Sequence, residues 1–270
     1  MSNTSLWVGV DISKDHLDVT ISPTGSHYCY TNSTTGIAEL LDNLDARVTL
    51  IVMEVSGGHE KPVLRSLQQV GWPVALVNAR KLRNYARARG ILAKTDKIDA
   101  DVLAHYAQTI QPVPSQPLRA EQYRLKSLVK RKRQVTSMIA QEKNRLEHMD
   151  DPDLLEEIRA HLTILEQKRA DFVQEIEAHI AADQAMARRY EILRSCKGVG
   201  PVLASVLIAD MPELGMIDHR KAKALAGLAP LNHDSGKQRG RRHIAGGRNY
   251  VRQCLYSAVM SACRYKPDIK

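Results

Sequence analysis

The stretch Leu6-Trp7-Val8-Gly9-Val10-Asp11 is an apolar run that ends in a carboxylate. A short run of this composition predicts a buried strand. The segment 48–54 repeats the pattern and also ends in an acid, Glu54. A carboxylate at the end of a buried strand loses hydration unless a cation or a hydrogen-bond donor meets it. Both runs therefore predict strands that are neighbours in one sheet, with an edge at which acidic side chains gather.

Around these two runs, strands and helices alternate up to about residue 114. The patterns predict strands at 6–11, 17–22, 27–31, 48–54 and 73–77, and helices at 36–44, 60–70, 79–89 and 96–109. Three leading strands followed by alternating helices and strands is the order of an RNase H-like α/β domain. We therefore expect an RNase H-like (RuvC-like) domain over residues 1–114.

Two further acids, Asp96 and Asp99, lie three residues apart and so share one face of the last of these helices. Asp101 is turned away from both by the helical repeat. Carboxylate oxygens are hard ligands that suit Mg²⁺ or Mn²⁺. We predict a magnesium site made of Asp11, Glu54, Asp96 and Asp99. The alternative is four separate carboxylates at strand ends and at a helix start.

The charge balance points to a polyanionic partner. The chain has 39 Lys and Arg against 30 Asp and Glu, a formal charge of +9. Aromatic residues are only 4%, so phosphate contacts are favoured over base stacking. The acid-free segment 78–94 supplies candidate nucleic-acid contacts at Arg80, Lys81, Arg83, Arg87, Arg89 and Lys94. A merely basic soluble protein with a solvated basic helix is the alternative.

The cysteines and the lengths of the apolar segments indicate the cellular compartment. Neither a C-x-x-C pair nor a zinc-finger spacing occurs among Cys29, Cys196, Cys254 and Cys263. They are expected to be reduced thiols. The N-terminus lacks a secretory signal, and no apolar stretch is long enough to span a membrane. We expect a cytoplasmic protein.

Residues 115–187 carry heptad-like apolar stripes. One stripe is Val135, Ile139, Leu146 and Met149, and the other is Ile158, Leu162, Leu165, Phe172 and Ile176. Between them, Asp151 is a candidate helix N-cap and Pro152 suits the first helical position. We expect an antiparallel coiled-coil hairpin that dimerises, with a basic root whose Lys130 and Arg131 contact nucleic acid. The alternative is a solvated coiled-coil face.

Residues 188–270 are predicted to be helical. The turn Cys196-Lys197-Gly198-Val199-Gly200-Pro201 is typical of a helix-hairpin-helix, in which backbone amides approach a phosphate. Lys197, Gly198 and Gly200 are the candidate contacts, and a plain helical hairpin is the alternative.

Further on, Ser235 lies in a glycine-flanked loop that is followed by Lys237, Arg239, Arg241, Arg242 and Arg248. A serine hydroxyl is a weak nucleophile until a base or a metal activates it. An ordinary loop serine is equally consistent with the residues.

Several motifs resemble the DEDD transposases of the insertion sequence 110 family, whose relatives include the Piv-type DNA invertases. In the N-terminal half these are Val10-Asp11-Ile12-Ser13-Lys14, Met53-Glu54-Val55-Ser56-Gly57-Gly58, Val77-Asn78-Ala79-Arg80 and Lys94-Thr95-Asp96-Lys97-Ile98-Asp99-Ala100. Gly198-Val199-Gly200-Pro201, Gly227-Leu228-Ala229-Pro230 and Asp234-Ser235-Gly236-Lys237 are similar to the family's C-terminal transposase domain. Family members usually continue with a further helix after a segment like Cys263-Arg264-Tyr265-Lys266-Pro267. The resemblance therefore implies either a truncated piece of a longer chain or a shortened natural copy, and a shortened copy would bind RNA or DNA yet recombine poorly. It also implies a bacterial protein associated with the nucleoid.

The resemblance implies three parts: a RuvC-like domain at 1–114, a coiled coil at 115–187 and a transposase (Tnp) domain at 188–270. It implies that Asp11, Glu54, Asp96 and Asp99 bind Mg²⁺ and that Ser235 forms a covalent phosphoserine link to DNA. It also implies a structured bridge RNA that pairs with donor and target DNA. The protein would be a homodimer that assembles as a tetramer on DNA, with acids and serine from different protomers.

The leading hypothesis is therefore a magnesium-dependent, bridge-RNA-guided DNA recombinase or transposase of a mobile element. One alternative is a RuvC-like structure-specific DNA endonuclease that uses water as its nucleophile. The other is a catalytically silent nucleic-acid-binding protein.

Overall fold

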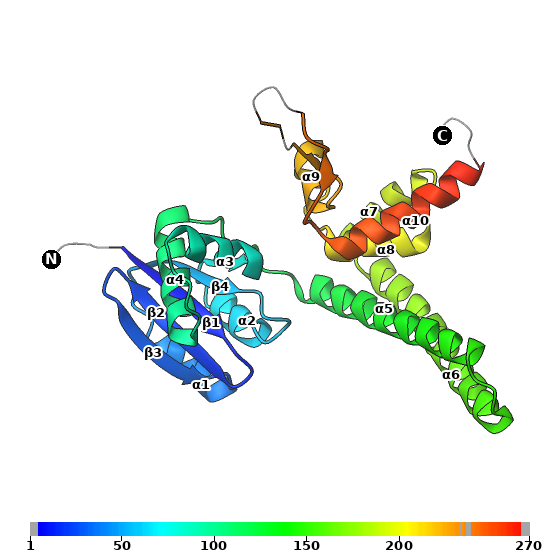
Figure 1. The fold of residues 1–270 in the computed structure, drawn as a ribbon, viewed down its shortest axis with the longest axis horizontal. Helices are drawn as coiled ribbons and strands as arrows, with labels where there is room; N and C mark the ends of the chain where they lie inside the picture. The colour runs from blue at the N-terminus through cyan, green and yellow to red at the C-terminus, as the bar shows by residue number, and fades with distance from the viewer. Residues whose placement is uncertain (1–4, 233, 236–238, 266–270) are drawn as a thin grey trace. The chain divides into compact units, whose positions relative to one another are not determined.

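The computed structural model describes residues 5–232, 234–235 and 239–265. The chain divides into two compact units, Met1–Pro117 and Leu118–Lys270 (Figure 1). Within the described residues, no helix is long and apolar enough to cross a membrane.

The first unit is built on a five-stranded sheet in the order β3-β2-β1-β4-β5. Its strands are β1 (Leu6–Ile12), β2 (His16–Ser22), β3 (Ser26–Thr31), β4 (Val48–Glu54) and β5 (Val74–Val77). The β1–β2 and β2–β3 pairs are antiparallel, whereas β1–β4 and β4–β5 are parallel. The prediction that the two acid-ended strands are neighbours is confirmed by the β1–β4 pairing.

Helices cover both faces of this sheet. They are α1 (Thr34–Asp42), α2 (Lys61–Gln69), α3 (Ala79–Ala88) and α4 (Asp96–Ile110). One face packs Val8 and Val10 of β1 against α1 and α2, and the other packs Leu50 and Val52 of β4 against α3 and α4. All these elements begin and end within two residues of their predicted bounds, because each buried face imposes its own period on the sequence.

Helix α4 approaches β1 closely at Gly9. A Cβ at this position would lie 2.2 Å from the amide nitrogen of Ala104 and 2.3 Å from the carbonyl oxygen of Ala100. Two hydrogen bonds also tie α4 to β2: the Thr20 hydroxyl donates to Asp101 Oδ1 (2.8 Å), and the Ser22 hydroxyl donates to Gln108 Oε1 (2.6 Å). Asp101 therefore faces the sheet, away from Asp96 and Asp99, as its helical position predicted.

The second unit begins with a hairpin of two long helices, α5 (Ala120–Glu147) and α6 (Pro152–Ala182). Val135 and Ile139 of α5 pack against Ile158, Leu162 and Leu165 of α6. The predicted cap at the start of α6 is confirmed, since the carboxylate of Asp151 accepts hydrogen bonds from the amides of the second and third helical residues. Whether the helices interlock as a true coiled coil stays a prediction.

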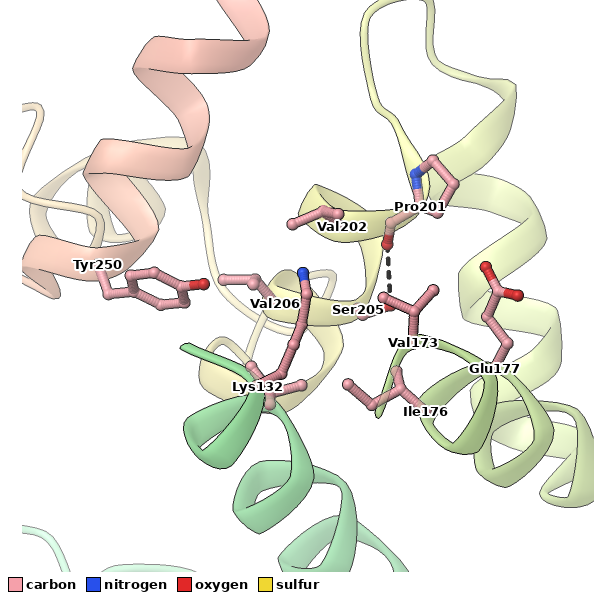
Figure 2. A pocket seen from close by; sticks show the side chains of 10 residues that line it. Lys132, Val173, Ile176, Glu177, Pro201, Val202, Ser205, Val206 and Tyr250 are labelled. Atoms are coloured by element: carbon pink, nitrogen blue, oxygen red, sulfur yellow. Dashed lines mark hydrogen bonds between the residues drawn. The ribbon is translucent and has the colours of Figure 1, made fainter. Parts of the chain in front are cut away.

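The root of the hairpin shares one core with the helices that follow it. These are α7 (Gln184–Ser195), α8 (Pro201–Asp210) and α10 (Asn249–Tyr265), and α9 (His219–Leu225) with the short strands β6 (Pro230–Leu231) and β7 (His243–Ile244) lies between α8 and α10 in sequence. Leu125 and Ile176 of the hairpin pack with Val206 of α8 and Val251 of α10. Figure 2 shows side chains of α5, α6, α8 and α10 gathered at this junction. Boundaries at 114/115 and 187/188 stay predictions.

Candidate active site

Three of the four predicted acids come from different elements of the first unit. Asp11 lies near the end of β1, and Glu54 is the last residue of β4. Because β1 and β4 are parallel neighbours, both acids lie at the carboxyl edge of the sheet. Asp99 lies in the first turn of α4, which starts there because the Thr95 hydroxyl accepts a hydrogen bond from the amide of Ile98 (3.2 Å). Asp99 is only 8% exposed.

The pKa shifts indicate that these carboxylates are near one another. Burial, then the negative charges of Asp99 and Glu54, raise the pKa of Asp11 to about 6. Burial also raises the pKa of Glu54, with Asp99 adding to the rise. The pKa of Asp99 is likewise raised by burial, while Lys94 and Arg83 oppose the rise. Asp96 is exposed and has the smallest effect on Asp11. The acids therefore form a cluster whose members repel one another.

Within the described ranges, no three or more His, Cys, Asp or Glu side chains are gathered closely enough to hold a metal ion as they stand. The chemistry of the cluster nevertheless fits a hard divalent cation, because every donor is a carboxylate oxygen. A cation also already lies against the cluster, since the Lys94 ammonium is 3.8 Å from Asp99 Oδ2. Binding a divalent ion would require the carboxylates to draw closer together.

Two side chains that the sequence analysis did not single out hold the loops beside the acids. Glu60, 6% exposed, accepts hydrogen bonds from the Ser56 amide (3.1 Å), the Ser56 hydroxyl (3.2 Å) and the Gly58 amide (2.8 Å). The Asn32 side-chain amide donates to the carbonyls of Ser13 (2.9 Å) and His59 (3.3 Å). Together they fix the loops that follow Asp11 and Glu54. A signal for Glu60 existed, namely an acid just after the Gly57-Gly58 turn.

The basic residues of segment 78–94 do not share one environment. Arg80, Lys81, Arg87, Arg89 and Lys94 are exposed and available to a phosphate backbone. The Lys81 ammonium also lies 5.7 Å from the centre of the Tyr106 ring. Arg83 is different, because its guanidinium donates to the carbonyls of Leu92 (2.6 Å) and Ala93 (3.3 Å). It holds the loop between α3 and α4.

Ser235 lies between β6 and β7 in the second unit and is exposed. Arg239, Arg241 and Arg242 follow it and are also exposed, whereas Lys237 lies outside the described residues. Arg248 has another role: its guanidinium donates to both carboxylate oxygens of Glu213, at 2.6 and 2.7 Å. The structure therefore brings the acids together in one unit and presents the serine in the other.

The turn predicted to be a helix-hairpin-helix lies between α7 and α8. Gly198 has φ +93°, a left-handed conformation that favours glycine, and Gly200 caps the start of α8. Lys197 is exposed in the same turn, and Lys130 and Arg131 are exposed on α5. A turn between two helices is present as expected, but its assignment as a helix-hairpin-helix and its contact with phosphate stay predictions.

Two family models match this chain. A model of DEDD transposases of the IS110 type, described as "Transposase", matches residues 8–151. A model described as "Transposase IS116/IS110/IS902 family" matches residues 190–270. The chain belongs to the IS110 transposase family. It is accordingly a DNA transposase or recombinase.

Relatives of this IS110-family chain include two proteins that are named for inverting a gene. The "pilin gene-inverting proteins" of Moraxella bovis and Moraxella lacunata are each 24% identical to it over 283 residues, which span 98% of this chain and 85% of theirs. A "probable family 20 transposase" of Pseudomonas aeruginosa is 30% identical over 44% of this chain and 35% of its own length. Among solved structures, Thermus thermophilus RuvC in complex with a Holliday junction substrate matches 42% of this chain and all of that chain, with 15% identity and a TM-score of 0.32.

Proposed function

We propose that this IS110-family protein is a divalent-metal-dependent, RNA-guided DNA recombinase that works through a covalent link between Ser235 and DNA. The observation that carries the proposal is the convergence of Asp11, Glu54 and Asp99 at one edge of the first unit's sheet. Such a group of one buried and two partly buried acids is costly to maintain and is explained by a need to bind a cation. The sheet order of this unit also suits an RNase H-like fold.

In this proposal Asp11, Glu54, Asp96 and Asp99 hold Mg²⁺, and Mn²⁺ would suit the same oxygen ligands. The bound ion would supply positive charge to the phosphate oxygens during transfer. The chain's own residues do the remaining work. The carboxylates position the cation, and the exposed Arg80, Arg87 and Arg89 bind the DNA backbone.

Ser235 is proposed as the nucleophile. Its Oγ gives up a proton and forms a bond to the scissile phosphorus, while the bond from phosphorus to one deoxyribose oxygen breaks. The leaving oxygen keeps the electron pair and takes up a proton. One P–O bond replaces another, so the reverse step rejoins strands without ATP. The exposed Arg239, Arg241 and Arg242 are placed near Ser235 in sequence to hold the phosphate.

The test is to trap the protein on a DNA substrate with Mg²⁺ and to look for a protein–DNA adduct under denaturing conditions. The wild type should give the adduct, and Ser235→Ala and Asp11→Asn should not. If Ser235→Ala still forms it, the serine assignment is wrong. If the wild type and Ser235→Ala both cleave DNA and neither forms an adduct, the endonuclease that uses water is favoured. A silent nucleic-acid-binding protein would show neither cleavage nor any effect of Asp11→Asn.

The partners are also part of the proposal. Donor and target DNA follow from the family, and a structured bridge RNA is proposed from the resemblance of the motifs. The exposed Lys130 and Arg131 at the hairpin root are suitable contacts for either polyanion. Sequencing of RNA that co-purifies with the protein tests the guide, and an abundant single structured species is expected. Light scattering tests the proposed dimer through the α5–α6 hairpin and the tetramer on DNA.

A further inference from the structure

Lys94 lies in the loop between α3 and α4, one residue before the helix cap. Its ammonium is 3.8 Å from Asp99 Oδ2. The Lys94 side chain is 70% exposed, whereas that of Asp99 is 11% exposed. A solvated cation is therefore paired with a carboxylate that has little access to water. Solvent screening weakens such a pair but leaves its geometry free to change.

The backbone on both sides of Lys94 is fixed. Before it, the Arg83 guanidinium donates to the carbonyls of Leu92 and Ala93, and the Ile91 amide donates to the Ala86 carbonyl (2.9 Å). After it, Thr95 caps α4. This arrangement aims one long, flexible side chain at the acids from a rigid base. Of the six basic residues in segment 78–94, Lys94 alone has an ion pair with a member of the acid cluster among the described residues.

The charge of Lys94 acts on acids of two elements. It opposes the rise in the pKa of Asp99 on α4, and it likewise opposes the rise that burial causes in the pKa of Glu54 at the end of β4. The ammonium therefore partly neutralises Asp99 and Glu54, the two acids whose charges contribute most to the raised pKa of Asp11. It stands where positive charge is most needed in a protein without a bound metal.

We propose that Lys94 is a built-in counter-ion of the acid cluster, which holds these carboxylates together without metal and competes with the divalent cation for them. This inference rests on the proposed metal site. When a divalent cation binds, the ammonium and the ion repel each other, and the exposed lysine side chain moves out of the cluster. It is then free to contact a DNA phosphate. Lys94 is thus a positioning residue whose loss strengthens metal binding.

The test measures the dissociation constant of Mn²⁺ for the protein without DNA, with free Mn²⁺ detected by its electron paramagnetic resonance signal. Lys94→Met should bind Mn²⁺ about three- to tenfold more tightly than the wild type, because the ion no longer has to displace an ammonium from its ion pair with Asp99. Lys94→Arg keeps the charge and should stay close to the wild type. Lys97→Met removes the same charge from an exposed site three residues further on, and it should have little effect.

A second measurement separates this role from a plain DNA contact. In the presence of a chelator, Lys94→Met should unfold at a lower temperature than Lys97→Met, because the carboxylates lose their counter-ion. Added Mg²⁺ should then raise its melting temperature more than it raises that of the wild type. A residue that only touches DNA phosphate would leave both DNA-free measurements unchanged, and that result overturns the inference.

Asp99→Asn separates a failure of the counter-ion role of Lys94 from a failure of the proposed metal site. If the wild type binds Mn²⁺, Asp99→Asn abolishes binding and Lys94→Met binds no more tightly, then the counter-ion role is wrong and the metal site stands. If the wild type binds no Mn²⁺ at all, both the metal site and the counter-ion role are wrong.

Discussion

The close approach of α4 to β1 at Gly9 gives the sharpest mechanical prediction. In Gly9→Ala the new methyl group would lie 2.2 Å from the Ala104 nitrogen, 2.3 Å from the Ala100 oxygen and 2.7 Å from the Leu103 carbonyl carbon. Ordinary contacts between such atoms are about 3.5–4.0 Å, so α4 must move away from β1 by about 1 Å or more. All three neighbours are backbone atoms, so no side-chain rotation can relieve the clash.

This displacement should affect catalysis more than folding. Asp99 precedes Ala100 on α4 and moves with it, whereas Asp11 stays on β1. A misplacement of about 1 Å costs about 10²-fold in rate when groups must meet at one reacting centre. Overpacking of this kind lowers the free energy of unfolding by about 1–3 kcal/mol. We expect Gly9→Ala to remain folded at low temperature and to cleave DNA about 10²-fold more slowly than the wild type.

The control is Val63→Ala in α2, which packs on the face of the sheet opposite to α4. Val63 is fully buried against the core of α1 and α2, so its truncation costs about 1–3 kcal/mol by creating a cavity. It belongs to a different core cluster from the buried residues of α4. Chemical denaturation and single-turnover cleavage are measured for both variants at a temperature where both are folded. Near-normal cleavage by Gly9→Ala, or equal losses in the two variants, would refute the reasoning.

Three further predictions concern single contacts. Glu60→Gln should lower the free energy of unfolding by about 1–2 kcal/mol near neutral pH, because the charged carboxylate that accepts three hydrogen bonds becomes a neutral amide, which is a weaker acceptor. The pKa of Glu60 is lowered in the folded protein, chiefly by hydrogen bonds that outweigh its burial, so its contribution is present above its unfolded pKa. The deficit should therefore vanish as the pH falls through the folded pKa, and urea unfolding across pH 3–7 checks this. Asp151→Ala should cost about 1 kcal/mol through loss of the α6 cap, and Asp150→Ala, which removes an uninvolved acid, should cost less in the same thermal assay. Arg248→Met should lower the free energy of unfolding and leave the salt dependence of DNA binding unchanged. Arg241→Met should leave the free energy of unfolding unchanged and lower the slope of DNA affinity against salt concentration, on logarithmic scales, by about one.

Much of the fold follows from periodicity alone. The runs at 6–11 and 48–54 are continuous because both faces of those strands are covered by helices, and their acids end neighbouring parallel strands. The helical repeat also assigned Asp96 and Asp99 to one face and Asp101 to another, and the bond from Thr20 to Asp101 bears this out. A signal at Gly9 was present too, since a glycine inside a strand indicates a close backbone approach. What the sequence could not give was the partner, because that depends on how α4 crosses the sheet.

The roles of individual basic residues were beyond the sequence for a different reason. Arg83 and Lys94 lie in one acid-free segment, and the sequence alone offers both as equivalent exposed cations. In the structure Arg83 donates to loop carbonyls, whereas Lys94 pairs with Asp99. Arg248 follows the serine loop among other arginines, yet Glu213 takes its guanidinium. Net charge predicts a polyanionic partner and cannot decide which cations are free to meet it. That depends on which acceptors the fold places within reach.

The acid cluster also explains why its surroundings are so firmly held. Repulsion between Asp11, Glu54 and Asp99 opposes the folded arrangement, so something must keep α4 against β1 when no divalent cation is present. The contact at Gly9 and the bond from Thr20 to Asp101 hold the helix from the sheet side. A mobile cation at Lys94 lowers the repulsion itself. Rigid backbone and movable charge therefore serve the same end by different means, and only the movable charge can withdraw when a metal takes its place.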